Sequence, residues 1–511
     1  MGCKSYWGTV IEQQGTLWNK GKDPCWRGVF YIQGTPAQRG DATVVDVILK
    51  DGYIPQGNRR VRADILVEDG KIAGFVNASH GVVAEKVISC EGRLVVPGGV
   101  DGHTHFNELE FSEREGFLNG TAAAAAGGVT TVVDMPDLPA VRSAAQFDRK
   151  AAAVKDKAYI DYGFWGGMTG EDVREGWTDR VYEQIDRGVC SFKLYMTPSV
   201  PTYPRVDDAE MLELFYKLAP TGIPVGIHAE NFIIADYYVK KFQREGRMEG
   251  PAWAEARTRV AERVAIQMVI SFAAETGARA HIVHMSTRDG VELIREAKAR
   301  GISVTAETCP HYLKLTAESA MTEFGSLAKI APPLRTEDDI EALWEGLRDG
   351  TVDFMGTDHA PYVVATEKHA PGMDIWTSLP GIPGVETLMP FMVSEGLNKG
   401  RLSLEQFVRV TSRHSAIHYG LYPKKGTMEI GADADFAIVD DTETWVIDPQ
   451  KLHSKAQYTP LQGLALTGKV KQTVLRGTVV YDDARDLVVA PGTGQFVPRQ
   501  SVQRLARWLQ H

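Results

Sequence analysis

Long hydrophobic runs are missing from this sequence of 511 residues. No apolar stretch approaches the roughly 20 residues that a membrane-spanning helix needs. The opening stretch "MGCKSYWGTVIEQQG" lacks the charged start and apolar core of a signal peptide, and Tyr6 stands where the myristoylation pattern requires Ser or Thr. We therefore expect a cytoplasmic protein with no membrane partner.

Cysteine and positive charge are also scarce. The five cysteines are odd in number and widely scattered, which fits reduced thiols better than a disulfide framework. The formal net charge of -10 argues against nucleic acid as the main partner, because phosphate binding needs a basic surface.

Two segments, one near each end of the chain, are rich in short strand-like runs. Apolar runs beside Gly-containing turns occur in "RADILVEDGKIAGFV" and again in "VKQTVLRGTVVYDDA". We expect a small β-sandwich domain assembled from residues 42–97 and 425–490, with 1–41 as an N-terminal extension and 491–511 as a C-terminal tail. The length allows such a domain beside one large barrel.

The middle of the chain alternates between strand-like and helix-like segments. Eight short apolar runs end in polar or Gly-rich residues: "VVPGGVDGHTH", "GVTTVVDMP", "AYIDYGFWGG", "CSFKLYM", "IPVGIHAE", "AHIVHMS", "ISVTAETCP" and "VDFMGTDHAP". This alternation predicts an α/β fold, a (β/α)₈ TIM barrel over residues 98–424. Residues 232–261 exceed a normal connection, so we expect a helical insertion near the barrel mouth.

Side chains that can bind metal fall at the ends of these runs. Residues i and i+2 of a strand share one face, so His103 and His105 aim two imidazoles at one point. Other runs supply Lys193, His228, His281, His284 and Asp358. Barrel enzymes keep their chemistry at the C-terminal ends of the strands, and imidazole with carboxylate suits zinc or a similar divalent ion.

Each of these residues also has a purely structural reading. His103 and His105 alone could be a half-buried strand pair, and Lys193 could extend its amine from a strand end to water. Their matching partners on other strands favour a metal site. His281 lies three residues before His284 and should pack in the core, while Cys309 should be a packed thiol.

The D-x-H-x-H, strand-lysine and T-D-H-A-P motifs resemble the amidohydrolase superfamily, in its branch of dihydroorotases, allantoinases and hydantoinases or dihydropyrimidinases. The resemblance covers residues 42 to about 490 and implies metal-dependent hydrolysis of a cyclic amide. By resemblance, one divalent ion takes His103, His105 and Asp358, a second takes His228 and His284, and N6-carboxylated Lys193 bridges both.

The resemblance makes zinc the first expectation, with manganese, cobalt or iron as alternatives. It also makes Asp358 the catalytic residue, which takes a proton from the attacking hydroxide and delivers it to the leaving nitrogen. Physical chemistry supports the lysine assignment separately. A bare ammonium beside two cations would be repelled, whereas carboxylation makes it an anion.

The motifs do not decide which cyclic amide is the substrate, because the chain differs from each subfamily at residues that usually contact the substrate. Asn107, Asp137 and Tyr362 replace residues that dihydroorotases usually carry, so this activity ranks low. Hydantoinases usually place an oxyanion-stabilising tyrosine where this chain has Pro198; Tyr195 and Tyr203 are the remaining candidates.

Allantoinases match in "NE" (107–108), "EGF" (115–117) and "AETCPHYL", although "NELEF" replaces their usual "NEPGR". We therefore predict allantoinase-like opening of a small ureide, hydantoin or imide ring, with hydantoinase, dihydropyrimidinase or cyclic imide hydrolase as the alternative. The candidate substrate contacts are Asn107, Tyr195, Tyr203 and Pro383. Phe111, Tyr237, Tyr238 and Trp253 are alternatives that would line a pocket for a bulkier ring.

Two other classes of protein, an inactive scaffold and a deaminase, fit the sequence less well. A catalytically inactive scaffold would have lost its metal ligands, and these are intact. A deaminase of the same superfamily usually lacks the bridging lysine, so Lys193 counts against it. A homo-tetramer or homo-dimer is implied by the resemblance alone.

Overall fold

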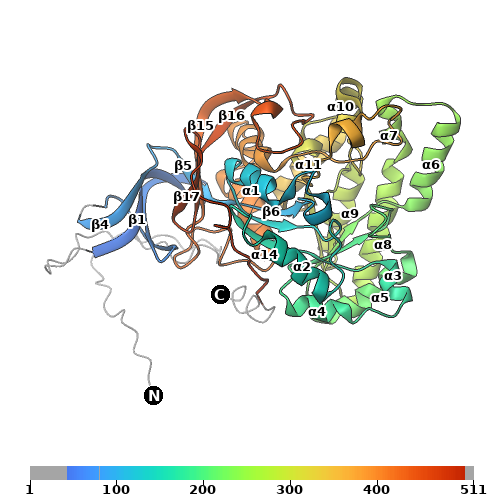
Figure 1. Cartoon of the computed structure of the whole chain (residues 1–511), viewed down its shortest axis with the longest axis horizontal. Helices are drawn as coiled ribbons and strands as arrows, with labels where there is room; N and C mark the ends of the chain where they lie inside the picture. Colours follow the sequence, from blue (N-terminus) through green and yellow to red (C-terminus); the bar gives the residue numbers. More distant parts are fainter. Residues whose placement is uncertain (1–42, 80, 501–511) are drawn as a thin grey trace, which may run out of the picture.

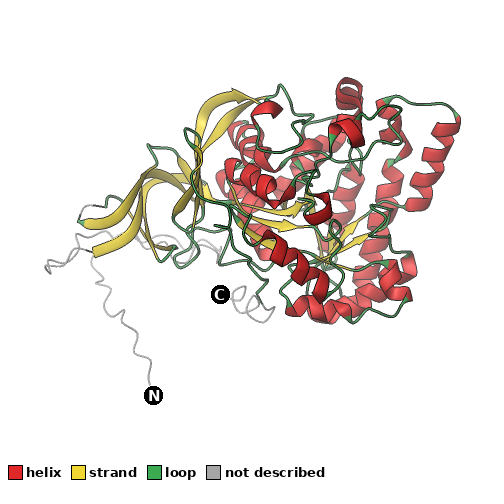
Figure 2. Cartoon of the chain, viewed as in Figure 1, coloured by secondary structure: helices red, strands yellow, loops and turns green. Residues whose placement is uncertain are grey.

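The computed structural model describes residues 43–79 and 81–500. The expected extension at 1–41 and residues 501–511 of the expected tail lie outside the described residues. Figure 1 shows a barrel wrapped in helices beside a β-domain made from the first and last described strands. Figure 2 shows the same division as a helix-rich body and a strand-rich one.

Parallel strands form the barrel at the predicted places. They are β6 (Gly99–Thr104), β7 (Val129–Asp134), β8 (Asp161–Phe164), β9 (Gly166–Gly167), β10 (Phe192–Tyr195), β11 (Val225–His228), β12 (Ala280–Ile282), β13 (Val304–Thr308) and β14 (Phe354–Met355). Trp165 alone separates β8 from β9, which together supply the third predicted run. The order β6-β7-β8 continues as β9-β10-β11-β12-β13-β14, and a bridge between Thr104 and His359 closes the ring.

Helices follow the strands and cover the outside of the barrel. They are α1 (Gly116–Ala126), α2 (Ala144–Val154), α3 (Gly170–Arg174), α4 (Arg180–Asp186), α5 (Asp208–Leu218), α6 (Phe232–Arg244), α7 (Gly250–Ala256), α8 (Arg259–Thr276), α9 (Arg288–Ala299), α10 (Ala317–Phe324), α11 (Glu337–Asp349), α12 (Leu388–Phe391), α13 (Leu404–Val408) and α14 (His414–His418). Helices α6 and α7 occupy the segment expected to be a helical insertion.

Side-chain acceptors fix where several helices begin. The Ser143 hydroxyl accepts the Gln146 N–H at the start of α2, and the Asp207 carboxylate accepts the Glu210 N–H at the start of α5. Such caps satisfy N–H groups that have no partner within the helix. Thr258 does the same for α8 by accepting the Ala261 N–H.

Two aromatic side chains fill the barrel interior. Trp165 and Tyr419 are fully buried, and their rings meet edge to face at 5.5 Å. A Cβ atom at Gly102 would lie 1.9 Å from the Tyr419 ring, and one at Gly226 would lie 2.5 Å from the Trp165 ring. The glycines of "DGHTH" and "VGIHAE" are therefore required by packing. The residues after them lie next to a densely packed barrel interior.

One nine-stranded sheet forms the β-domain, in the order β18-β17-β16-β15-β5-β1-β2-β3 with β4 also paired to β1. Its strands are β1 (Thr43–Gln56), β2 (Arg59–Glu68), β3 (Lys71–Val76), β4 (Val82–Ser89), β5 (Leu94–Pro97), β15 (Phe436–Val446), β16 (Ala465–Leu475), β17 (Thr478–Asp482) and β18 (Asp486–Leu487).

Strand β1 bends this sheet. Its first half pairs with β4 and its second half reaches β5, with an irregularity between Leu49 and Gly52 where Asp51 has φ 63°. The bend brings Ile65, Val95 and Val474 into one core. The two layers of the sandwich are therefore halves of one continuous sheet, which is how bulged strands turn corners.

These observations confirm the predicted fold class, a barrel with a β-domain built from segments near both ends of the chain. The exact domain limits stay a prediction. Among the described residues, no helix is both long and apolar enough to cross a bilayer.

A buried charge cluster links the barrel to the β-domain. The Lys425 amine lies 2.7 Å from Asp435 and 2.9 Å from Asp433, and it also pairs with Asp161 at the start of β8. Burial opposes its charge, but attraction to the three carboxylates outweighs burial and raises the Lys425 pKa. Arg476 adds a second cation against Asp161.

Replacing Lys425 with Met is expected to lower the free energy of unfolding by about 3–5 kcal/mol, because it leaves buried carboxylates without a counter-ion. Urea denaturation followed by tryptophan fluorescence measures this change. Lys451→Met is the control, since the Lys451 side chain is 83% exposed. Equal effects of the two substitutions would contradict a supporting role for the cluster.

Candidate active site

The C-terminal ends of the barrel strands bring all six predicted metal-binding residues together. They surround a cavity of about 270 Å³, lined among others by His105, Lys193, His228, His284 and Asp358. His103 is fully buried behind this lining. His103, Lys193 and His228 lie in β6, β10 and β11, and His105, His284 and Asp358 lie in the segments after β6, β12 and β14.

Three of these side chains form one cluster. His103 Nε2 and His105 Nε2 each lie 3.2 Å from Asp358 Oδ1, and the three donor atoms are close enough to hold one metal ion. Burial raises the pKa of Asp358, but His103 and His105 outweigh it and lower that pKa well below its usual range. The carboxylate is therefore an anion.

His228 and His284 form a second cluster beside the first. His228 Nδ1 lies 3.1 Å from His284 Nε2, and the His284 ring lies 5.2 Å from that of His103. His284 and Asp358 have φ angles of 41° and 47°. Such sparsely populated conformations of non-glycine residues gather at functional sites.

Lys193 lines the same cavity as residues of both clusters. Its side chain is fully buried, and its amine has no hydrogen-bond partner among the described residues. Burial lowers the Lys193 pKa to about 8, against the attraction of Asp358, Glu307 and Asp137. A buried amine without a partner is costly, and a readily deprotonated amine can take up CO₂. These properties fit a carboxylated lysine.

Carboxylates that the sequence analysis did not assign hold the histidine rings. His103 donates from Nδ1 to Glu307, His105 Nδ1 lies 3.0 Å from Asp137, and His228 Nε2 lies 2.8 Å from Glu230. Each bond leaves the other ring nitrogen beside the remaining donors, Asp358 for His103 and His105 and His284 for His228. This arrangement is typical of metal-binding histidines. The signal for Glu230 is its place two residues after His228; Glu307 lies 204 positions from His103 and carries none.

The predicted substrate contacts divide into two groups. Tyr195 lines the cavity and donates to Asp137 Oδ2 at 3.1 Å. Asn107, Tyr203 and Pro383 are not among its lining residues. Asn107 donates to the His105 carbonyl and Tyr203 to the Lys193 carbonyl, so both support backbone beneath the cluster. Their contact with substrate stays a prediction.

Histidines that do not belong to the six predicted metal-binding residues contact other groups. His281 is buried, stacked on Phe354 and 2.9 Å from Thr305 Oγ1. His359 accepts the N–H of Gly384, next to Pro383. The buried, stacked position of His281 agrees with the core packing expected from the sequence.

Aromatic and cationic side chains form the outer wall of the cavity. Trp253, one of the alternatives that the sequence offered, lines it, and Trp376, Lys329 and Arg257 line it without having been singled out from the sequence. Tyr238 instead borders a separate groove beside α6. Trp376 carried no signal because it lies in an irregular loop far from any motif.

Comparisons with known proteins agree with this geometry. A model of the amidohydrolase family matches residues 94–480. The L-hydantoinase of Paenarthrobacter aurescens is 35% identical over 462 residues, covering 90% of this chain and 99% of the relative. An allantoinase of Rubrobacter xylanophilus is 37% identical over 458 residues, covering 89% and 98%.

A solved structure of L-hydantoinase (dihydropyrimidinase) from Arthrobacter aurescens superposes with a TM-score of 0.85 at 34% identity, covering 89% of this chain and 100% of that one. The chain belongs to the amidohydrolase family. Within it, these relatives place the chain in the cyclic-amidohydrolase branch, which confirms the resemblance seen in the sequence motifs.

Replacing Tyr203 with Phe is expected to lower the free energy of unfolding by about 0.5–1.5 kcal/mol, the usual contribution of one buried hydrogen bond. KM should stay within about twofold of the unchanged protein, because the hydroxyl bonds the Lys193 carbonyl instead of facing the cavity. Thermal denaturation and steady-state kinetics measure both effects, with Tyr195→Phe as the cavity-lining comparison. A tenfold rise in KM would restore Tyr203 as a substrate contact.

Proposed function

We propose that this protein hydrolyses the ring amide bond of a hydantoin-type cyclic ureide with the help of two divalent cations. The observation that carries the proposal is the presence of two donor clusters and the unpartnered Lys193 amine in one cavity. Among proteins of this branch, the intact donor set favours an enzyme over an inactive scaffold.

The donor atoms fit the cations that the family implies. His103, His105 and Asp358 would hold the first ion, His228 and His284 the second, and Lys193 carboxylated by CO₂ would bridge them. Zinc is the first candidate for this nitrogen and oxygen donor set, with manganese, cobalt or iron as alternatives. Such ions, when bound, make water a stronger nucleophile at neutral pH and polarise a carbonyl group.

Asp358 is placed to move the proton. Its carboxylate faces the cavity and is anionic, so it can accept a proton from the water that attacks the ring carbonyl. A new C–O bond forms, the ring C–N bond breaks, and Asp358 returns the proton to the leaving nitrogen. For a hydantoin, the product is an N-carbamoyl amino acid.

The outer wall favours an apolar substituent on the ring. Trp253 donates its indole N–H to the Ile330 carbonyl and Trp376 donates to the Arg247 carbonyl, at 2.8 and 2.7 Å. Both indoles are therefore fixed, and Leu379 extends their apolar surface in the cavity lining. We place a 5-substituted hydantoin first and allantoin second, because the two fixed indoles offer an apolar substituent a contact surface that a polar ureido group would not use.

A small cyclic amide is thus the proposed partner. A homo-tetramer or homo-dimer, proposed from the family resemblance, and a cytoplasmic location complete the proposal. The location is supported by Cys90, Cys190 and Cys309, which are buried free thiols of the kind that reducing compartments maintain.

Replacing Lys193 with Ala is expected to lower kcat/KM by at least about 10³-fold, because several kcal/mol of cation-dependent stabilisation would be lost and each 1.36 kcal/mol is tenfold. The metal content per chain, measured by plasma mass spectrometry, should fall with it. Lys329→Met is the control: this lysine lines the same cavity but bonds the carbonyls of Trp376 and Ser378. Full metal content and activity in Lys193→Ala would refute the proposed site.

A ring-opening panel tests the substrate. We expect 5-benzylhydantoin to exceed hydantoin and allantoin in kcat/KM, with dihydrouracil and dihydroorotate lower. Trp376→Ala should reduce kcat/KM for 5-benzylhydantoin roughly 10-fold or more, as losing 1.5–3 kcal/mol of apolar contact predicts, and spare hydantoin. A preference for allantoin, unchanged by Trp376→Ala, would show that the wall does not select the substituent, while hydrolysis itself would stand.

A further inference from the structure

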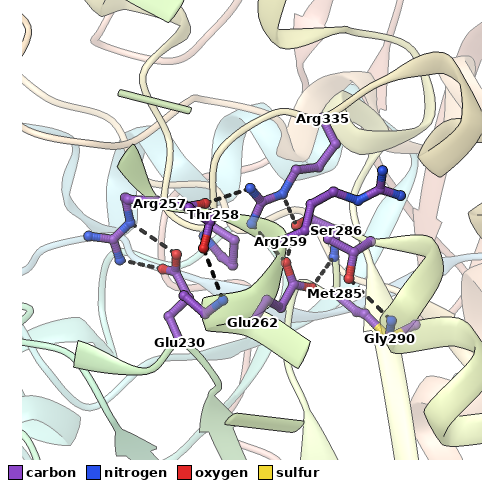
Figure 3. Close-up of polar contacts among 12 residues, drawn as sticks. Glu230, Arg257, Thr258, Arg259, Glu262, Met285, Ser286, Gly290 and Arg335 are labelled. Carbon is purple, nitrogen blue, oxygen red and sulfur yellow. Dashed lines mark hydrogen bonds and ion pairs between the residues drawn. The ribbon is translucent and has the colours of Figure 1, made fainter. Parts of the chain in front are cut away.

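Two arginines and two glutamates form a buried network behind His228 and His284. Figure 3 shows Glu230, Arg257, Glu262 and Arg335 facing one another around the start of α8. Both glutamates are almost completely buried, and the two arginine side chains are 11% and 5% exposed. None of the four has a role in the proposed proton transfer.

One arm of the network ends on His228. Glu230 accepts from His228 Nε2 at 2.8 Å, and Arg257 grips the same carboxylate with two nitrogens, Nε at 3.0 Å from Oε1 and Nη2 on Oε2. A neutral imidazole that donates from Nε2 presents a lone pair at Nδ1. Since a forked guanidinium–carboxylate pair fixes direction as well as charge, Arg257 fixes the orientation of His228 through Glu230.

The other arm ends beside His284. Arg335 binds Glu262 Oε2 at 3.0 Å and the Ser286 hydroxyl at 3.1 Å. Glu262 also accepts the Ser286 N–H at 2.9 Å. Ser286 lies two residues after His284, whose φ of 41° needs support from its surroundings. This arm therefore holds the backbone that follows the strained histidine.

A backbone carbonyl joins the arms. Arg335 Nη1 donates to the Arg257 carbonyl at 2.6 Å. Arg257 precedes Thr258, which caps α8, and Glu262 lies in the first turn of the same helix. The two arms thus form one unit at the helix start, visible as a continuous run of dashed contacts in Figure 3.

The first donor cluster is supported differently. Glu307 and Asp137 hold His103 and His105, and in residues 43–79 and 81–500 neither of these carboxylates pairs with an arginine. Loss of an arginine should therefore affect one half of the site more than the other.

We propose that Arg257 and Arg335 are positioning residues that set His228 and His284 as a pair for the second divalent cation. The inference rests on the proposed function, because it takes these histidines as metal ligands. It assigns the arginines no contact with the reacting atoms.

The test compares Arg257→Met and Arg335→Met with a matched control, Arg259→Met. Arg259 lies two residues from Arg257 but pairs with Asp339 at 2.5 Å, and its side chain is 39% exposed. Each purified protein, loaded with zinc or cobalt, is dialysed against graded chelator, and bound metal per chain is measured by plasma mass spectrometry. The visible absorption of the cobalt proteins reports the coordination of each site without relying on activity.

We expect the unchanged protein and Arg259→Met to hold both ions alike. Arg257→Met and Arg335→Met should bind the second ion about 10–100-fold more weakly, the usual effect of losing a residue that orients a ligand, while keeping the first. Arg257→Lys should recover part of the loss, since it restores the charge but not the fork. Unchanged affinity for both ions in folded Arg257→Met and Arg335→Met would overturn the inference.

Failure of the proposed function gives a different result. An unchanged protein that binds no divalent cation would refute the metal site itself. If Arg257→Met does not fold, as judged by circular dichroism, Glu230→Gln probes the same contact with a side chain of equal size. Selective weakening of the second ion in Glu230→Gln would support the inference, and unchanged binding would overturn it.

Discussion

Three histidines at the barrel mouth, His103, His105 and His228, each use one ring nitrogen to bond a buried carboxylate. The opposite nitrogens of His103 and His105 then lie beside Asp358, and that of His228 lies beside His284. The carboxylates offset the cost of burying so many polar groups in one place. The chemistry of the cavity therefore depends in part on Glu230 and Glu307, which are not among its lining residues.

The rigid floor beneath the histidines comes from the same stretches of sequence. Gly102 and Gly226 lie directly before the strand ends that carry His103 and His228, and each makes room for a buried ring. Because the Trp165 and Tyr419 rings fill the interior, the strand ends cannot shift inward without a clash. Packing thus fixes the positions of the ligand-bearing backbone, and hydrogen bonds fix the directions of the side chains.

Local patterns in the sequence were enough to predict the barrel strands and the convergence of the six donors. The period of two in "HTH" places His103 and His105 on one face, and strand-end positions predict that Lys193 and Asp358 join them. Contacts that depend on tertiary structure left no such pattern. Glu307 is 204 positions from His103, Lys425 meets Asp161 across 264 positions, and the bend in β1 needs two partner strands at once.

The segment before α8 connects the cavity wall, which contacts the substituent of the proposed substrate, to the support of His228. Helix α7 carries Trp253 on the cavity wall and ends one residue before Arg257, whose guanidinium lies 4.9 Å from the Trp253 ring and also grips Glu230. A substitution of Trp253 on the cavity wall would therefore change the surroundings of Arg257, which bonds the carboxylate that holds His228. In this chain, the cavity wall at Trp253 and the support of His228 therefore share one segment, whereas His103 is held by Glu307 on a different strand, β13.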